Sequence, residues 1–292
     1  MKKHLLKSTL LGACLAALVN IPANAAVVTI GYWRGGENDT PVPNFNVVPG
    51  ELGTANTTAV DYTGNYNLSQ YGTGGPITGT AYYGSSAAYA GVGGLPAGSS
   101  VALIPTGDVG YYTSAINAGT ANFGFQTYVR PNNTTGIQVI ASNGGVSNGW
   151  NLFTANGTDV GFSAGYRYFA EVVGLGILDS GITVDAGGAV HNIAYVNDNG
   201  SNLFYYDFTQ VASANFGGIT AAGANFSLGF RASNVDLYYT GTIDEARLFT
   251  FAEGGFSASD LQNYVVPEPS TFAMLLVGGI GSFVAFRRRA RF

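Results

Sequence analysis

Few residues in the body of this chain could do covalent chemistry. Between residues 26 and 266 the sequence has one histidine, His191, and neither cysteine nor lysine. This composition excludes cysteine nucleophiles, Schiff-base lysines and metal sites built on several histidines. A catalytic triad would need partners for His191 that no motif indicates. We therefore expect His191 to be a structural residue at the edge of a strand.

Paired carboxylates are the remaining route to catalysis, because glycosidases use two carboxyl groups about 5–9 Å apart on one face. Asp244 and Glu245 are adjacent, and only alternate residues of a strand share a face. Their side chains should therefore point in opposite directions. Arg247 should also face away from Asp244, unless a β-bulge intervenes. We expect these three residues to form a structural group, and we predict no catalytic residue.

Calcium is the one cofactor that the residues leave open. Calcium prefers carboxylate and carbonyl oxygens, and Asp39, Asp61 and Asp198 lie in segments rich in asparagine and glycine. They are weak candidates for metal ligands. No D-x-D-x-D-G loop is present, and the "NDNG" around Asp198 is first of all a turn.

The elements that must position these residues are predicted to be β-strands. Segment 122–131 alternates so that Phe123, Phe125 and Val129 share a face. Residues 191–208 predict a hairpin, since two aromatic-rich runs flank "NDNG". Shorter strands are expected at 225–233, 235–243 and 245–251, and a helix of one or two turns at 257–264.

Many short strands separated by turn residues predict an all-β fold of two antiparallel sheets packed as a sandwich. The body of about 240 residues is long enough to fold as one such domain without a disulfide. Its five arginines face sixteen carboxylates, which gives a formal charge of −11. That charge argues against binding to nucleic acid or to an anionic membrane surface.

The N-terminal residues have the three parts of a secretory signal peptide. Three lysines precede an apolar run (10–19), and the small residues "ANA" (23–25) form a cleavage site. We predict a signal helix within residues 1–25 and a mature chain that starts near Ala26. An alternative signal is "LGAC", which resembles a lipobox with Cys14 as the acylated residue.

The C-terminal segment combines three features in a fixed order. Pro267, Glu268 and Pro269 precede the uncharged residues 271–286. As a transmembrane helix these would span about 24 Å, just enough for a short crossing of a hydrocarbon core of roughly 30 Å. The positive-inside rule would keep the arginines that follow in the cytoplasm. They are Arg287, Arg288, Arg289 and Arg291.

This order of "PEP", short apolar helix and arginine cluster resembles the PEP-CTERM sorting signal of Gram-negative bacteria. The resemblance implies transient insertion in the inner membrane and cleavage near the PEP motif by an exosortase-type enzyme. The body is then expected at the cell surface or in the exopolysaccharide matrix. A permanent C-terminal membrane anchor is the alternative.

Four segments of the body also occur in the order of a known family: "YWRGGEND", "FGFQTYVRP", "VHNIAYVNDNGSNLFYYD" and "GTIDEARLFTFAEGGFSASDL". They resemble bacterial laminin-G-like domains, which have a concanavalin A-like jelly-roll fold. Val190, Asn192 and Phe208 depart from the family pattern, which has Trp, His and Gly there. The resemblance implies one jelly-roll domain over 26–264, followed by the sorting signal at 265–292. It also implies calcium as a candidate cofactor.

These features predict an exported, surface-sorted module that binds or supports the exopolysaccharide matrix and has no enzymatic activity. Exposed tyrosines beside Asn and Asp would suit stacking on a glycan and hydrogen bonding to it. The alternative is a carbohydrate-active hydrolase on the same fold, which two facing carboxylates in a cleft would favour. A third hypothesis is a matrix protein without a specific ligand.

Overall fold

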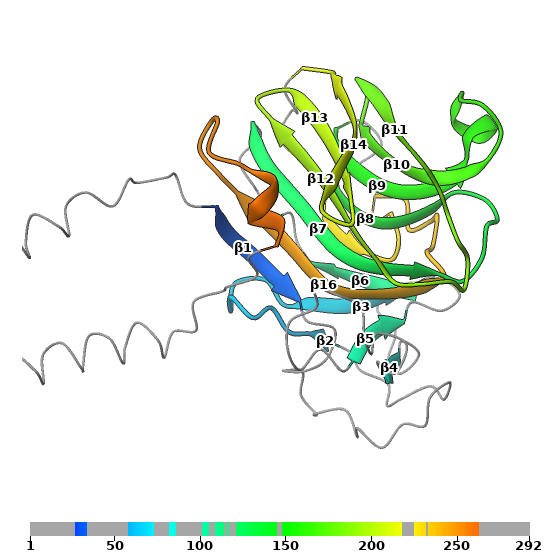
Figure 1. The fold of residues 1–292 in the computed structure, drawn as a ribbon. Helices are drawn as coiled ribbons and strands as arrows, with labels where there is room; N and C mark the ends of the chain where they lie inside the picture. Colours follow the sequence, from blue (N-terminus) through cyan, green and yellow to red (C-terminus); the bar gives the residue numbers. More distant parts are fainter. Residues whose placement is uncertain are drawn as a thin grey trace, which may run out of the picture.

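The computed structural model describes residues 27–33, 58–72, 82–85, 101–104, 109–113, 116, 121–144, 148–217, 225–231 and 233–262. Within these ranges the chain forms sixteen β-strands and two short 3-10 helices. The strands make two antiparallel sheets of eight strands each (Figure 1). The prediction of an all-β fold of two antiparallel sheets is confirmed.

The strand order defines the two sheets. Sheet A has the order β14-β13-β12-β7-β16-β5-β4, and β1 pairs with β16; sheet B has the order β11-β10-β9-β8-β15-β6-β3-β2. The strands of sheet A are β1 (Val28–Trp33), β4 (Tyr82–Ser85), β5 (Val101–Ile104), β7 (Asn122–Pro131), β12 (His191–Asp198), β13 (Ser201–Tyr206), β14 (Thr209–Asn215) and β16 (Gly241–Thr250). The strands of sheet B are β2 (Thr58–Ala59), β3 (Leu68–Gly72), β6 (Val109–Thr113), β8 (Gln138–Gly144), β9 (Gly149–Asn156), β10 (Tyr166–Val172), β11 (Gly176–Thr183) and β15 (Phe226–Leu228).

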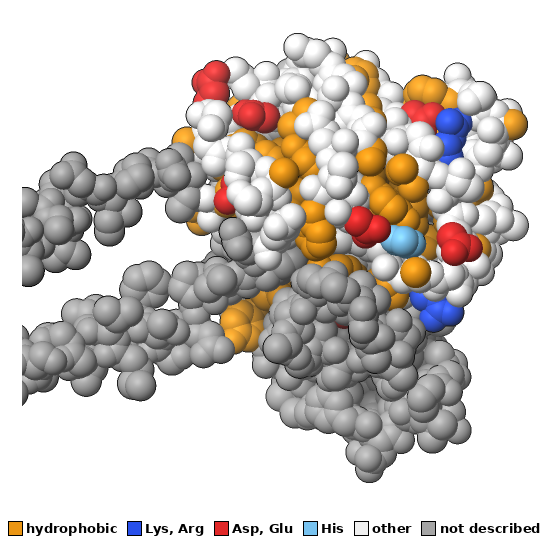
Figure 2. All heavy atoms as spheres, viewed as in Figure 1, with side chains coloured by type: hydrophobic (Ala, Val, Ile, Leu, Met, Phe, Trp, Pro, Cys, Tyr) orange, Lys and Arg blue, Asp and Glu red, His pale blue; other side chains and the backbone are white. Residues whose placement is uncertain are grey.

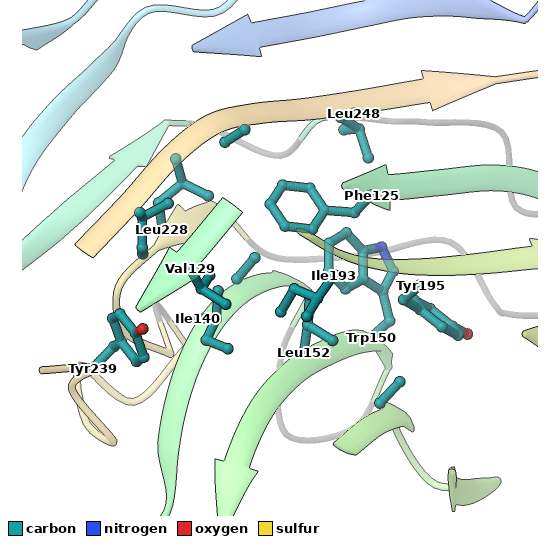
Figure 3. Close-up of a cluster of buried hydrophobic side chains, with 14 of the residues drawn as sticks. Phe125, Val129, Ile140, Trp150, Leu152, Ile193, Tyr195, Leu228, Tyr239 and Leu248 are labelled. Carbon is teal, nitrogen blue, oxygen red and sulfur yellow. The ribbon is translucent and has the colours of Figure 1, made fainter. Parts of the chain in front are cut away.

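The main core lies between the sheets. Phe125 and Val129 of β7 pack there with Leu152 of sheet B, and all three are 0% exposed (Figure 3). The ring of Trp150 lies 5.5 Å from that of Phe125. Alternate residues of β7 therefore face the core, as the period-two pattern predicts.

The predicted hairpin is also confirmed. β12 and β13 pair in register from Ile193–Tyr206 to Asp198–Ser201. Asn199 and Gly200 join them with φ of 49° and 89°, a backbone that asparagine and glycine adopt more readily than other residues. This turn sets which residues of the hairpin lie opposite each other.

The segment 235–243 is not one regular strand. Val235 and Leu237 have φ of 55° and 54°, which interrupts an extended chain. Arg231 donates two hydrogen bonds to the carboxylate of Asp236, at 2.8 and 2.7 Å, and closes this part into a loop. The prediction of a strand there is wrong, and β16 begins only at residue 241.

After β16 the chain turns back onto the outer face of sheet A. Phe256 and Leu261 pack there against Val196 and Phe249, and Nε2 of Gln126 donates to the main-chain oxygen of Leu261 at 2.8 Å. The helix predicted in this segment is a single 3-10 turn, η3 (Ala258–Leu261), which begins at a Ser257 capping box. The other 3-10 helix is η2 (Gly157–Val160).

The predicted signal helix and transmembrane helix lie outside the described residues, as do the domain boundaries at 25/26 and 264/265. Among the residues that are described, no helix has the length and apolar character to cross a bilayer.

Candidate functional site

Sheet A brings His191 next to a carboxylate. Asp207 and Phe208 form the turn between β13 and β14, with φ of 46° and 66°. The turn directs the Asp207 carboxylate back to the start of β12, where Oδ2 lies 2.9 Å from Nδ1 of His191. Its Oδ1 accepts a hydrogen bond of 2.9 Å from the backbone N–H of Asn192. The hairpin register thus holds the two side chains together.

Two tyrosines complete this group. The ring of Tyr206, the last residue of β13, stacks on His191 with centroids 4.7 Å apart and planes at 28°. Tyr168 belongs to β10 in sheet B, and its ring centroid lies 6.0 Å from that of Tyr206. We name Tyr168, His191, Tyr206 and Asp207 the His191 cluster. It joins the two sheets where β12 begins and β13 ends.

The hydroxyl of Tyr168 is the unusual atom of the cluster. Tyr168 is 1% exposed, and its hydroxyl has no hydrogen-bond partner in the part of the chain that the structure describes. Burial raises the pKa of Tyr168 most, and Tyr206, Asp207 and Asp185 raise it further. The phenol is therefore a neutral donor at neutral pH. Leaving such a buried donor unpaired costs about 1–3 kcal/mol. Buried polar groups therefore usually have a hydrogen-bond partner, either in the protein or in an ordered water molecule.

The outer part of the cluster reaches solvent. The side chain of His191 is 21% exposed and that of Asp207 is 49% exposed. Figure 2 shows the pale blue histidine beside a red carboxylate, with hydrophobic side chains close to both. A ligand could therefore contact His191 and Asp207 from solvent.

The loop between β11 and β12 adds a second carboxylate. Arg130 donates from Nη2 to the main-chain oxygen of Gly187 at 2.9 Å and fixes this loop to the end of β7. The loop carries Asp185, which raises the pKa of Tyr206 after burial and Asp207. Two carboxylates therefore act on the same phenol.

The second polar group of sheet A contains the adjacent carboxylates Asp244 and Glu245. A β-bulge in β16 places both residues between the core residues Ile243 and Ala246, and Glu245 has φ of 49°. The expectation that their side chains point to opposite faces is wrong. The extra residue of the bulge leaves both on the outer side of sheet A.

Tyrosines enclose this acid pair. The Tyr32 hydroxyl donates to Oε2 of Glu245, and Oγ1 of Thr127 donates to the main-chain oxygen of Asp244 at 2.8 Å. Burial raises the pKa of Tyr128, and Glu245 and then other carboxylates raise it further. Asp244 and Glu245 are each 0% exposed, so neither carboxylate contacts solvent. We name Tyr32, Tyr128, Asp244 and Glu245 the Glu245 cluster.

Arg247 lies on the same side of sheet A as Asp244, because the bulge shifts it there. The β-bulge is the exception that the sequence analysis allowed for this pair. Nε of Arg247 donates to Oγ1 of Thr29 at 2.9 Å, and Nη1 donates to the main-chain oxygen of Asp260 at 3.0 Å. Its guanidinium lies 4.8 Å from the ring centroid of Phe249. These contacts fasten β1 and the segment after β16 to the sheet, in keeping with a structural role.

The three calcium candidates lie in different settings. Asp61 is 2% exposed and its carboxylate accepts five hydrogen bonds, so its oxygens already have donors. Asp198 ends β12, and Asp39 lies outside the described residues. The described residues contain no group of three or more His, Cys, Asp or Glu placed to hold a metal ion. Calcium binding stays a prediction. The donors to Asp61 are the backbone N–H groups of Tyr32, Thr63, Asn65 and Tyr66 and the hydroxyl of Thr63.

Sequence analysis did not single out Asp207, Tyr206 or Tyr168. The first two follow from the predicted hairpin, because its register places the residues after Tyr205 opposite the start of β12. Tyr168 comes from the other sheet, and a single strand pattern carries no signal of which strands face each other across a core.

The C-terminal segment has a clear relative. Residues 265–289 match the PEP-CTERM protein-sorting motif. The chain carries a PEP-CTERM sorting signal. Such a signal is an exosortase substrate, and it marks a protein for export and processing at the cell envelope of Gram-negative bacteria. The match includes the "PEP" of residues 267–269 and the first three arginines of the cluster.

The sandwich is similar to domain 4 of AbnA, a GH43 extracellular arabinanase from Geobacillus stearothermophilus, in complex with arabinotriose. The TM-score is 0.57 at 17% sequence identity, over 81% of this chain and 98% of that one. A mutant GH54 α-L-arabinofuranosidase soaked with 4-nitrophenyl α-L-arabinofuranoside has a TM-score of 0.51 at 11% identity, over 82% of this chain and 59% of that one. At these identities the similarity shows the fold alone. No curated protein sequence matches the chain.

Proposed function

We propose that this chain is a surface-sorted module that binds glycan in the exopolysaccharide matrix and catalyses no reaction. Its body is then a laminin-G-like jelly-roll domain, with the His191 cluster as the binding site. The sorting signal supports the location, because it directs a protein out of the cytoplasm.

The observation that carries the proposal is the makeup of the His191 cluster. A half-buried ring pair, Tyr206 on His191, lies beside the exposed carboxylate of Asp207. Sugars present apolar C–H faces and hydroxyl groups, which such a combination can bind. The arabinotriose in the complex of domain 4 of the arabinanase supports a role of this kind for the fold.

Burial of the acid pair argues against catalysis. A glycosidase needs two carboxyl groups in contact with the substrate, whereas Asp244 and Glu245 are 0% exposed. A hydrolase is the second candidate, because a GH54 α-L-arabinofuranosidase has a similar fold.

A glycan array tests the binding function, with protein recovered from the cell surface in parallel calcium and chelator series. Retention of specific glycans with no release of reducing ends is the expected result. Release of reducing ends would replace the proposal with the hydrolase. Retention of no glycan would leave a matrix protein without a specific ligand, and loss of retention in chelator would make calcium a cofactor.

The processing step has its own test. Proline lacks the backbone N–H of a helix and restricts the residue before it to extended geometry, so 266–269 should be accessible to a processing enzyme. Intact-mass analysis of protein from the cell surface should show a chain that ends before about residue 270. If Arg287 to Arg291 remain on most surface molecules, the segment is a permanent anchor.

A further inference from the structure

The segment after β16 is held on the outer face of sheet A up to its last described residue, Gln262. Figure 1 shows this segment in orange, beside β1. Leu261 is 0% exposed, and its main-chain oxygen accepts from Nε2 of Gln126 at 2.8 Å. The main-chain oxygen of Asp260 accepts from Nη1 of Arg247 at 3.0 Å. Two side chains of the sheet therefore fix the backbone of the final turn.

The turn η3 is also closed by its own hydrogen bonds. The carboxylate of Asp260 accepts from the backbone N–H and the hydroxyl of Ser257, at 2.7 and 2.9 Å. The backbone N–H of Gln262 donates to the main-chain oxygen of Ser259 at 3.1 Å. Unwinding the turn would break these bonds and expose Leu261, so η3 adds no free length to the chain that follows it.

The chain between η3 and the PEP motif is short. Four residues, 263–266, separate Gln262 from Pro267. Even fully extended, this spacer reaches about 18 Å at most. A folded body of about 240 residues has a radius of gyration of about 18 Å. An enzyme that cuts near residues 267–269 must therefore approach the body within that distance.

We infer that the enzyme that removes the sorting signal acts on the folded body and contacts the outer face of sheet A around η3. This inference rests on the proposed processing of the signal and is independent of glycan binding. The residues that hold η3 precede the signal in the chain, so they leave the cytoplasm before it. All-β domains fold in about milliseconds to seconds, while the arginines at the end of the signal resist translocation.

The surface around η3 indicates the character of its partner. Ser257, Ser259 and Gln262 are exposed there, as is Glu253 in the preceding loop. Residues 251–262 contain two carboxylates and no lysine or arginine. An enzyme surface with uncharged or basic side chains is complementary to this composition.

Deletion of residues 263–265 tests the inference in the full-length protein, produced in its native host. The PEP motif then begins two residues after Gln262, within about 7 Å of the docked turn. We expect the processed fraction to fall at least tenfold, because the body blocks access to the motif. Intact-mass analysis and an immunoblot against the body measure the processed and unprocessed chains.

Two matched variants separate length from sequence and from docking. Replacing Asn263, Tyr264 and Val265 by serine keeps the length of the spacer and should keep native processing. Adding Leu261→Asp to the deletion should restore at least half of the native processing, because undocking η3 returns its residues to the spacer. The intact mass of the processed chain shows whether the body of that variant remains whole.

Unchanged processing in the deletion variant overturns the inference, since the enzyme would then act before η3 docks. Loss of processing in the serine variant overturns it too, because the enzyme would then be reading the sequence of the spacer. The same holds if Leu261→Asp fails to restore processing. A native protein that keeps its sorting signal at the cell surface counts against the processing step itself and leaves the glycan array unaffected.

Discussion

The His191 cluster and the Glu245 cluster both combine tyrosines with carboxylates, but we expect them to have different roles. Each combines two tyrosines with at least one carboxylate of sheet A, and in each the pKa of a tyrosine is raised by burial and nearby acids. They differ in access, because Glu245 is 0% exposed whereas the side chain of Asp207 is 49% exposed.

The difference teaches that residue type alone does not locate a binding site in this fold. The Glu245 cluster encloses its carboxylates, whereas the His191 cluster leaves the Asp207 carboxylate in contact with solvent. Predictions that separate stability from binding can therefore test the assignment of each cluster.

The largest expected effect is alkaline unfolding, which both clusters share. A phenol has a pKa of about 10 in the unfolded chain, and burial raises the pKa of Tyr128, Tyr168 and Tyr195 well above it. The unfolded state therefore loses protons first, and stability falls as pH rises above about 10. Each fully buried phenol contributes up to ~1.4 kcal/mol per pH unit.

Urea unfolding between about pH 9 and 12 measures this loss. Tyr128→Phe and Tyr168→Phe, one variant for each cluster, should each make the free energy of unfolding fall less steeply with pH. A slope that neither variant alters would mean that these phenols ionise in the folded protein as easily as in water.

The next largest effect separates the clusters. Asp244→Ala should lower the free energy of unfolding by about 2–4 kcal/mol, because it removes a buried carboxylate that accepts from the backbone N–H of Glu245. In a body of this size that is ~5–15 °C in melting temperature. Glycan affinity of the folded fraction should not change.

Asp236→Ala is the control for that variant. Asp236 pairs with Arg231 at the surface, with 39% of its side chain exposed, and such pairs contribute about 0–1 kcal/mol. Calorimetric melting compares the two variants. A stable Asp244→Ala protein that has lost glycan binding would move the Glu245 cluster into the binding site.

The smallest effect compares two tyrosines of one strand. Tyr166→Phe should cost about 1–2 kcal/mol, since its hydroxyl makes several hydrogen bonds. Tyr168→Phe should be neutral or slightly stabilising, because it removes an unpaired buried hydroxyl. Urea unfolding at neutral pH measures the change in free energy of unfolding for both variants. A large loss in Tyr168→Phe would mean that its hydroxyl has a structural partner, such as an ordered water.

Local patterns predicted the parts of the fold that depend on local chemistry. The alternation of β7 and the turn residues Asn199 and Gly200 are both visible in the sequence, and both hold. The loop at 235–240 was missed because Val235 and Leu237, both branched apolar residues, adopt positive φ. The strand propensities of valine and leucine do not predict a positive φ.

The candidate site was predictable only in part. His191 was visible, but its partner Asp207 required the exact hairpin register, and Tyr168 required knowledge of how the two sheets face each other. The bulge at Glu245 was likewise missed, because regular alternation places Asp244 and Glu245 on opposite faces. Errors of this kind arise where tertiary contacts override a periodic pattern.

The most direct test of the central claim is a crystal structure of the surface-recovered protein with bound arabinotriose. The claim predicts a sugar in contact with the Tyr206–His191 ring pair and a sugar hydroxyl within about 2.7–3.0 Å of the Asp207 carboxylate. A trisaccharide bound elsewhere on the sandwich, away from Tyr206, His191 and Asp207, would contradict it.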